Sequence, residues 1–301
     1  MKSSEGGREH AERSLARHNA QNEAAGLYIV ATPIGNARDI TLRALDVLNA
    51  CDLIAAEDTR VTAKLLAIHG ISKPLTPYND HNAARERSRL ISRLTEGARI
   101  ALLSDAGTPL ISDPGYKLVR EALAQGVAVH AIPGPSAALT GLTLAGLPTD
   151  RFYFAGFLPA KQGERRRALE AARSVNSTLI FFESPRRTAE TLADMRDILG
   201  ERNAAVAREL TKIHEEVRRG NLGVLASEFA ARSPPKGEIT IVVAPPLSPE
   251  ADFAKADLLL QKAMIHMPLS AAAELIATAL DLPKRAAYER GLSLKATNDA
   301  R

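Results

Sequence analysis

Two carboxylates and several hydroxyls lie within ten residues of one another near the middle of the chain, where they could bind a small ligand. Ser104, Asp105, Ser112 and Asp113 stand in this stretch, with glycine and proline between them. The apolar run 99–103 before it predicts a buried strand, and a helix is expected over 116–125. The connection is longer than the usual loop of about two to six residues between a strand and a helix.

We expect residues 104–115 to form a ligand-binding loop, because ligands bind beyond the carboxyl ends of strands in α/β sheets. Asp113 is expected to be the N-cap of the following helix and Pro114 its first residue. The alternative is a capped connection with ordinary turn chemistry and no ligand. The length of the loop favours the ligand.

Three further stretches could also approach a ligand. Residues 32–36 predict a tight turn after the first strand, where backbone can come close to a bound molecule. Glu57 and Asp58 follow the second strand, although acids there also favour the start of a helix. Residues 133–136 open a helix whose free N–H groups attract a carboxylate or a phosphate. For the first two stretches a structural role remains an open alternative.

A fifth stretch, residues 181–187, places two arginines where their charge is unfavourable. Ser184 is expected to cap a helix and Pro185 to begin it, so Arg186 and Arg187 would lie in its first turn. Cations there oppose the helix dipole at about 0.3–1 kcal/mol each. An anion should offset this cost, either an internal glutamate or a phosphate.

Several classes of protein are excluded by what the sequence lacks. The 301 residues carry a net charge of +4 and one cysteine, which fits a cytoplasmic protein without a disulfide framework. The chain has no glycine-rich dinucleotide or triphosphate loop, and its histidines are scattered, so we expect no metal site. No apolar run is long enough to span a membrane.

Alternating strand and helix patterns from residue 26 onward predict a mainly parallel sheet covered on both faces. We expect a leader over 1–25, α/β domains over 26–149 and 150–246, and a small helical domain over 250–295. The polar leader is interpreted as a disordered tail or as a start codon placed too far upstream. Residues 245–249 are expected to be a linker. Helices expected over 269–280 and 284–292 are typical of a helix-turn-helix, or equally of a lid without a nucleic-acid role.

Long strings in a fixed order make the resemblance to a known family specific. The sequence resembles the tetrapyrrole methylase superfamily, and within it the ribosomal RNA small subunit methyltransferase I branch. The matching strings are ATPIGN at 31–36, AAEDTR at 55–60, SDAGTP at 104–109, SDPG at 112–115, PGPSA at 133–137, FESPRR at 182–187, ARELTK at 207–212 and KGE at 236–238. The leader departs from the family pattern.

The resemblance implies a two-domain tetrapyrrole-methylase-like α/β fold with a small C-terminal helix-turn-helix-like domain. It implies methyl transfer from S-adenosylmethionine to the ribose 2′-hydroxyl of a cytidine in 16S ribosomal RNA, by a homodimer. The cofactor would lie between the two α/β domains, with its methionine end on the first. The expected cofactor-binding residues are Pro33, Ser104, Asp105, Ala106, Gly107, Ser112, Asp113, Ser136, Ala137, Phe182, Glu183, Leu210 and Thr240.

A ribose hydroxyl is a weak nucleophile, so a nearby base should accept its proton. The candidates are Glu57, Asp58, Asp80 and His81, with Asp58 preferred. Phosphate contacts are expected from the cations, namely Arg60, Lys161, Arg165, Arg166, Arg167, Arg186 and Arg187. An assembled or partly assembled small ribosomal subunit is the expected substrate.

Two rival functions remain open. A methylase of corrin or porphyrin precursors would use the same cleft, but it would have no use for a helical tail that carries basic residues. A ribosome-associated binding protein would keep a vestigial cleft and transfer no methyl group.

Overall fold

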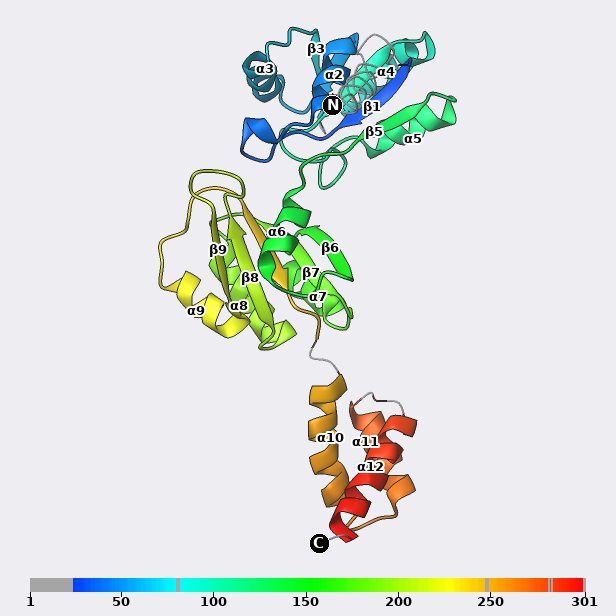
Figure 1. Ribbon diagram of the computed structural model, residues 1–301, viewed down its shortest axis with the longest axis vertical. Coiled ribbons are helices and arrows are strands. Elements are labelled where there is room, and N and C mark those ends of the chain that lie inside the picture. Colours follow the sequence, from blue (N-terminus) through cyan, green and yellow to red (C-terminus); the bar gives the residue numbers. More distant parts are fainter. Residues whose placement is uncertain (1–23, 80–81, 247–248, 281, 283, 300–301) are drawn as a thin grey trace, which may run out of the picture.

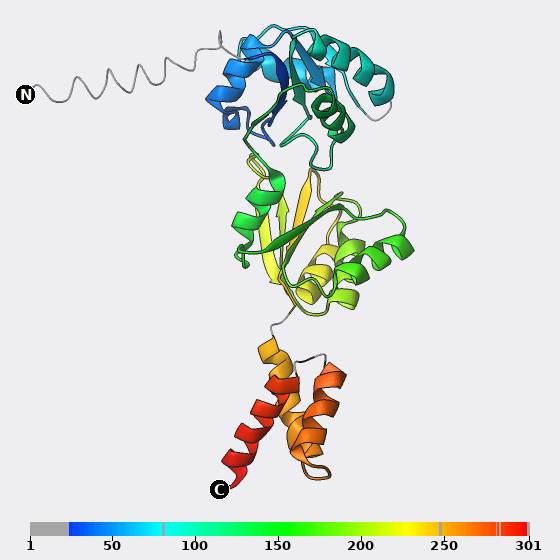
Figure 2. The same ribbon diagram turned by 90° about the vertical axis from the view of Figure 1, so that its right-hand side faces the viewer.

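The computed structural model describes residues 24–79, 82–246, 249–280, 282 and 284–299. It has three parts, which follow one another along the long axis of the molecule (Figures 1 and 2). Two α/β domains come first and a group of helices ends the chain. The expected leader over 1–25 lies outside the described residues, apart from its last two positions.

The first domain is built on a five-stranded parallel sheet with the strand order β3-β2-β4-β1-β5. Every residue of β2 is buried, as the expected cover on both faces requires. The strands are β1 (Gly26–Val30), β2 (Leu53–Ala56), β3 (Leu75–Pro77), β4 (Arg99–Leu103) and β5 (Val129–Ile132). The prediction of a parallel sheet from strand–helix alternation is therefore confirmed.

Helices cover both faces of this sheet. A short 3-10 helix η2 (Ala37–Asp39) precedes α2 (Leu42–Ala50), which packs with α3 (Thr59–Ile68) in the core on one face. Helices α4 (Ala83–Thr95) and α5 (Tyr116–Ala124) pack on the opposite face. Because all five strands run the same way, the loops that follow them gather at one edge of the sheet.

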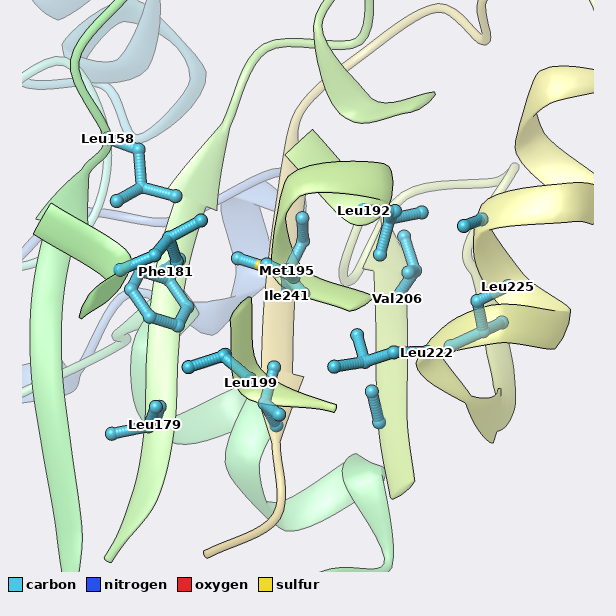
Figure 3. Close-up of a cluster of buried hydrophobic side chains, with 14 of the residues drawn as sticks. Leu158, Leu179, Phe181, Leu192, Met195, Leu199, Val206, Leu222, Leu225 and Ile241 are labelled. Atoms are coloured by element: carbon cyan, nitrogen blue, oxygen red, sulfur yellow. The ribbon is translucent and has the colours of Figure 1, made fainter. Parts of the chain in front are cut away.

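The second domain contains a mixed sheet with the order β6-β7-β10-β8-β9, in which only β6 and β7 are parallel. Its strands are β6 (Phe152–Phe157), β7 (Thr178–Glu183), β8 (Asn203–Arg208), β9 (Glu216–Asn221) and β10 (Ile239–Val243). Helices α7 (Gln162–Ala172), α8 (Thr188–Leu199) and α9 (Leu222–Ala230) cover one face. Figure 3 shows the core between these helices and the sheet, where Met195 lies beside Ile241 and Leu222 lies near Val206.

Helix α6 (Ala137–Ala145) covers the other face of the second sheet. Its Ala138 and Leu142 pack against Ile180 and Val242, so by packing α6 belongs to the second domain. The chain therefore crosses between the domains at residues 133–136, ahead of the boundary expected between residues 149 and 150. Gly141 allows this contact, because a Cβ there would lie 2.8 Å from Cγ2 of Thr240.

Two helices begin later than the sequence predicts. Helix α5 has Gly115 as its N-cap, so Asp113 and Pro114 belong to the loop and the expected cap is wrong. The tight packing of Gly115 decides this, because a Cβ there would lie 2.8 Å from Cδ2 of Leu102. Helix α8 begins at Thr188 after the N-cap Arg187, which leaves Ser184 and Pro185 in a preceding turn.

The last part consists of α10 (Pro249–Ala263), α11 (Leu269–Leu280) and α12 (Lys284–Asp299). Leu260 of α10, Ile276 of α11 and Ala287 of α12 share one small core. The sequence predicted α11 and the first half of α12 but missed α10. Among the described residues, no helix is both long and apolar enough to cross a membrane.

Candidate active site

A cleft of about 410 Å³ lies between the two α/β domains. This volume is in the usual range for sites that hold a small molecule. The first domain, the crossing segment and the first residue of α6 contribute residues 34, 57, 105–108, 111–113, 136 and 137. The second domain contributes residues 157, 182–185, 210 and 237–240.

The charge of the lining has one sign. Within the described part of the chain, its ionisable side chains are all carboxylates, and no lysine, arginine or histidine lines the cleft. They belong to Glu57, Asp105, Asp113, Glu183 and Glu238. Such a cleft suits a ligand that carries positive charge.

Three of these carboxylates share one corner of the first domain. Glu57 follows β2, whereas Asp105 and Asp113 lie in the loop after β4. The backbone N–H of Asp58 donates to Oδ1 of Asp105 at 2.9 Å, and the N–H of Asp105 donates to Oε2 of Glu57 at 3.3 Å. These reciprocal bonds join the two loops and hold both carboxylates at the cleft.

The surroundings of Asp113 and Asp105 raise the pKa of both carboxyl groups and so disfavour their ionised forms. Burial, reinforced by the charge of Glu57, raises the pKa of Asp113 to about 6, although a hydrogen bond from Ser104 opposes the shift. Burial also raises the pKa of Asp105. Shifts of this kind are common where a site is arranged for a ligand or a proton transfer.

The loop between β4 and α5 holds an unusual backbone. Leu110 has φ 72° and Ser112 has φ 67°, which is a costly region for residues with a side chain. Backbone hydrogen bonds join Gly107 to Thr32 in both directions, at 2.8 and 3.0 Å. The Thr108 hydroxyl donates to the carbonyl of Pro135 at 3.1 Å. The loop is thus fixed to the turn after β1 and to the crossing segment.

The N-terminus of α6 faces the same cleft through Ser136 and Ala137. The Ser136 side chain makes no capping hydrogen bond, so the first N–H groups of the helix are free of that cap. Such a terminus suits the carboxylate of an amino-acid group. Positive and negative ends of one ligand could therefore be held a short distance apart.

The second domain supplies an apolar wall and acids that are paired with cations, of which Glu183 is the buried one. Phe157 and Phe182 meet edge to face with ring centroids 5.5 Å apart. Glu183 is buried, accepts from the Thr191 hydroxyl at 2.7 Å and pairs with Arg187 at 2.6 Å. An internal glutamate therefore offsets the charge of Arg187, as one of the two expected alternatives proposed.

Most of the predicted cofactor residues line this cleft. They are Asp105, Ala106, Gly107, Ser112, Asp113, Ser136, Ala137, Phe182, Glu183, Leu210 and Thr240. Pro33 and Ser104 are not in the lining. Ser104 is buried and its hydroxyl donates to the carbonyl of Ala106 at 3.3 Å, so it supports the loop from behind.

The candidate bases differ in whether they line the cleft. Glu57 lines the cleft, whereas Asp58 does not. Asp58 caps α3 by accepting from the N–H of Arg60 at 2.8 Å, and its carboxylate pairs with the Arg60 guanidinium at 2.6 Å. These hydrogen bonds lower the pKa of Asp58 to about 2, which makes it a weak base. Asp80 and His81 lie outside the described residues.

Part of the lining was not predicted from the sequence. The missed residues are Ile34, Thr108, Ile111, Phe157, Ser184, Pro185, Gly237, Glu238 and Ile239. Most of them lie within or beside the strings that carry the family resemblance. Phe157 lies in none of them, and its role follows only from the position of β6 beside β7.

The predicted RNA-binding cations differ in their availability. Arg60, Lys161, Arg167 and Arg186 are exposed, whereas Arg166 is partly exposed and bonds Asp194 at 2.7 Å. Arg165 must be corrected, because its side chain is only 1% exposed and bonds the buried Asp194 at 2.7 Å. Arg187 is held by Glu183 in the same way. Neither guanidinium is free for a phosphate.

No cluster of three His, Cys, Asp or Glu side chains that could hold a metal ion occurs in the part of the chain that the structure describes.

Comparison with known proteins agrees with this geometry. A family model described as tetrapyrrole (corrin/porphyrin) methylases matches residues 26–226, and one described as the RsmI C-terminal HTH domain matches residues 250–295. A ribosomal RNA small subunit methyltransferase I from Mesorhizobium japonicum is 53% identical over 90% of this chain and 93% of its own. One from Thermotoga maritima is 46% identical over 217 residues, which is 72% of this chain and 97% of its own.

Solved structures match the fold at lower identity. The uroporphyrin-III-C-methyltransferase of Thermus thermophilus superimposes with a TM-score of 0.53 at 22% identity, over 72% of this chain and 94% of its own. The fold and the cleft thus define the class, a two-domain α/β methylase. The chain belongs to the tetrapyrrole (corrin/porphyrin) methylases, in the family of ribosomal RNA small subunit methyltransferase I.

Proposed function

We propose that this chain transfers the methyl group of S-adenosylmethionine to small-subunit ribosomal RNA. One observation carries the proposal: among the residues that the structure describes, five carboxylates and no basic side chain line the interdomain cleft. The sulfonium and the ammonium group of that donor are both cations, and the family relatives are named as methyltransferases of this RNA. Bound S-adenosylmethionine supplies an electrophilic methyl group and needs position and electrostatics from the protein.

The residues of the cleft fit the two ends of this donor. Asp105 and the loop around it suit the cationic groups, and the N-terminus of α6 suits the carboxylate of the methionine end. Phe182, Leu210 and Thr240 would face the adenosine end. Thr240 is buried beneath the cleft and Phe182 packs against Phe157, so this wall is preformed.

The finer assignment is a ribose 2′-hydroxyl of a cytidine as the methyl acceptor. A hydroxyl needs a base near its own proton, and the cleft offers Asp113 and Glu57. We favour Asp113, because a pKa of about 6 leaves it ionised at neutral pH and still able to accept a proton. Asp58 is not proposed as the base, because its ion pair with Arg60 holds its carboxylate outside the cleft.

RNA would reach the cleft over the exposed cations of both domains. Arg60 stands three residues after Glu57, and Arg186 directly follows Pro185 of the lining. Lys161 and Arg167 add charge on α7. The target base must be unstacked, so an assembled or partly assembled small subunit is the substrate we propose. We also propose that the protein acts as a homodimer in the cytoplasm.

A labelling experiment tests the assignment against its rivals. Purified protein is incubated with methyl-labelled S-adenosylmethionine and, in parallel, with small ribosomal subunits, protein-free 16S RNA or uroporphyrinogen. Label in the RNA of the subunits is the expected result. A 2′-O-methyl group blocks alkaline cleavage of the next phosphodiester, so the label should remain in an alkali-resistant dinucleotide that begins with cytidine.

The other outcomes are equally informative. Label in uroporphyrinogen would favour a tetrapyrrole methylase, and label in neither substrate would favour a binding protein with a vestigial cleft. Methylation of free RNA as fast as of subunits would contradict the proposed substrate form.

A further inference from the structure

Residues 209–212 form a short strap between β8 and β9 that touches both α/β domains. Two of its four residues, Glu209 with φ 51° and Thr211 with φ 64°, have a left-handed backbone despite carrying side chains. Among the described residues, the other non-glycine positions with positive φ are Leu110 and Ser112 of the ligand loop. Strain of this kind persists where surrounding contacts impose it.

Lys212 ties the strap to the second domain. Its Nζ donates to Oε1 of Glu209 at 2.7 Å and to Oε2 of Glu238 at 2.9 Å. Oε1 of Glu209 also accepts from the backbone N–H of Glu238 at 3.1 Å. The hydrogen bond from Lys212 lowers the pKa of Glu209 below its ordinary value. One ammonium thus joins two carboxylates from separate loops.

The strap also contacts the first domain, at the turn after β1. A side chain at Gly35 would clash with Lys212 and Thr211, so the turn after β1 lies directly against the strap. The backbone N–H of Asn36 donates to Oγ1 of Thr211 at 3.2 Å. Leu210 packs with Ile34 of the same turn in a small apolar cluster.

The strap is therefore a wall of the cleft as well as a contact between domains. Leu210 and Glu238 line the cleft from the second domain, and Ile34 lines it from the first. We propose that Lys212 is a positioning residue, which holds this wall and the turn after β1 at the separation that the methyl donor requires. The identity of that donor rests on the function proposed above.

A set of three lysine variants tests the proposal. Lys212→Met removes the charge at similar length, and Lys212→Arg keeps a cation. The matched control is Lys284→Met, which removes a lysine that pairs with Glu274 at 2.7 Å far from the cleft. Two quantities are measured on the full chain: amide hydrogen exchange of the free protein at Asn36 and Glu238, and the affinity for S-adenosylhomocysteine by calorimetry.

Lys212→Met should speed exchange at both amides and weaken binding of S-adenosylhomocysteine by roughly 3- to 30-fold, the range expected for a residue that acts through its neighbours. The melting temperature should fall only slightly, and Lys212→Arg should recover most of the affinity. The Lys284→Met protein should match the wild type in both measurements. If Lys212→Met fails to fold, Thr211→Val offers a second variant, because it removes only the bond to Asn36. It should also speed amide exchange at Asn36 and weaken the binding of S-adenosylhomocysteine.

Wild-type exchange at Asn36 in the Lys212→Met protein would overturn the proposal, since the strap would then not hold the first domain. Faster exchange with unchanged affinity would also overturn it, because the contact would not position the ligand. If the wild type itself binds no S-adenosylhomocysteine, the proposed function fails, and the exchange rates still decide whether Lys212 holds the two domains together.

Discussion

The acidic residues of the cleft differ in whether their charge is already balanced. Glu183 is paired with Arg187, whereas Asp105 and Asp113 are raised in pKa by burial and by their acidic neighbours. A bound cation would relieve this repulsion, because an opposite charge nearby favours the ionised form. The corner around Asp105 and Asp113 is therefore the part of the cleft that we expect to recognise the sulfonium group.

At Asp113, replacement by asparagine separates a base from a simple binding residue. If Asp113 accepts the hydroxyl proton, Asp113→Asn should lower kcat by about 100-fold or more. In the wild type, kcat/KM should rise with pH through about 6, the pKa of Asp113 in the free protein. The profile of kcat should turn at lower pH, because the bound cation lowers that pKa. A variant with a higher KM and an unchanged kcat would contradict the role of base.

The same variant should gain stability while it loses activity. The pKa of Asp113 is about 6 in the folded protein and 3.8 without the fold, so the wild type loses stability as pH rises between these values. Above pH 6 the Asp113→Asn protein should be more stable by about 1–2 kcal/mol, since partial exposure screens part of the shift. Below pH 4 the difference should vanish in urea unfolding.

At the scale of elements, the sequence predicts most strands but misplaces the starts of two helices, α5 and α8. Apolar runs such as Leu53–Ala56 are strands because both faces of the sheet are covered. The start of α5 depends instead on a long-range contact, because Gly115 packs against Leu102 and Leu110. No local pattern contains that contact, so Asp113 was misassigned as the cap although its place in the ligand loop was predicted.

Gly115→Ala should destabilise the protein for this reason. The residue has φ 138°, and an added Cβ would meet Leu102 at 2.8 Å. We expect a loss of about 1–3 kcal/mol in urea unfolding, together with weaker S-adenosylmethionine binding because the loop is displaced. Gly126→Ala provides a matched control, since it also has positive φ but has open space around its Cβ. Equal losses in the two variants would mean that packing at Gly115 is unimportant.

The three consecutive arginines of α7 should divide into structural and RNA-binding members. Arg165 and Asp194 form a buried pair, so Asp194→Ala should cost about 3–5 kcal/mol of stability. Arg167→Met, at an exposed position, should leave stability unchanged and weaken RNA binding with a smaller salt dependence. Thermal unfolding and filter binding at several salt concentrations measure these effects. Loss of RNA affinity in a folded Arg165→Met protein would contradict the purely structural role of Arg165.

At the scale of the molecule, the cleft depends on how the two domains meet. The strand ends of the first domain could be predicted from the sequence, because parallel strands bring their loops to one edge. The second-domain wall could be proposed only by resemblance, since residues 182, 210 and 240 are far apart in the chain and meet through an antiparallel sheet. The crossing at residues 133–136 was missed because it depends on where α6 packs.

Removal of the helical part should leave donor binding intact. Residues 250–295 hold six acidic and six basic side chains, so this part adds no net charge for phosphates. Within it, Lys284, Arg285 and Arg290 are paired with acids. The chain 1–246 should bind S-adenosylmethionine as tightly as the full protein, with little change in the salt dependence of RNA binding. A much smaller salt slope would show that these helices contact phosphates.

The most direct test of the account is a calorimetric titration of the full chain with S-adenosylmethionine, beside S-adenosylhomocysteine and the Asp105→Asn variant. We expect one site per chain and a preference of the wild type for S-adenosylmethionine over S-adenosylhomocysteine. Asp105→Asn should reduce that preference by about 5- to 30-fold, or 1–2 kcal/mol, while S-adenosylhomocysteine, which lacks the sulfonium charge, binds nearly as before. No heat with the wild type, or an equal loss of affinity for both ligands in the variant, would contradict an acidic cleft built for a sulfonium.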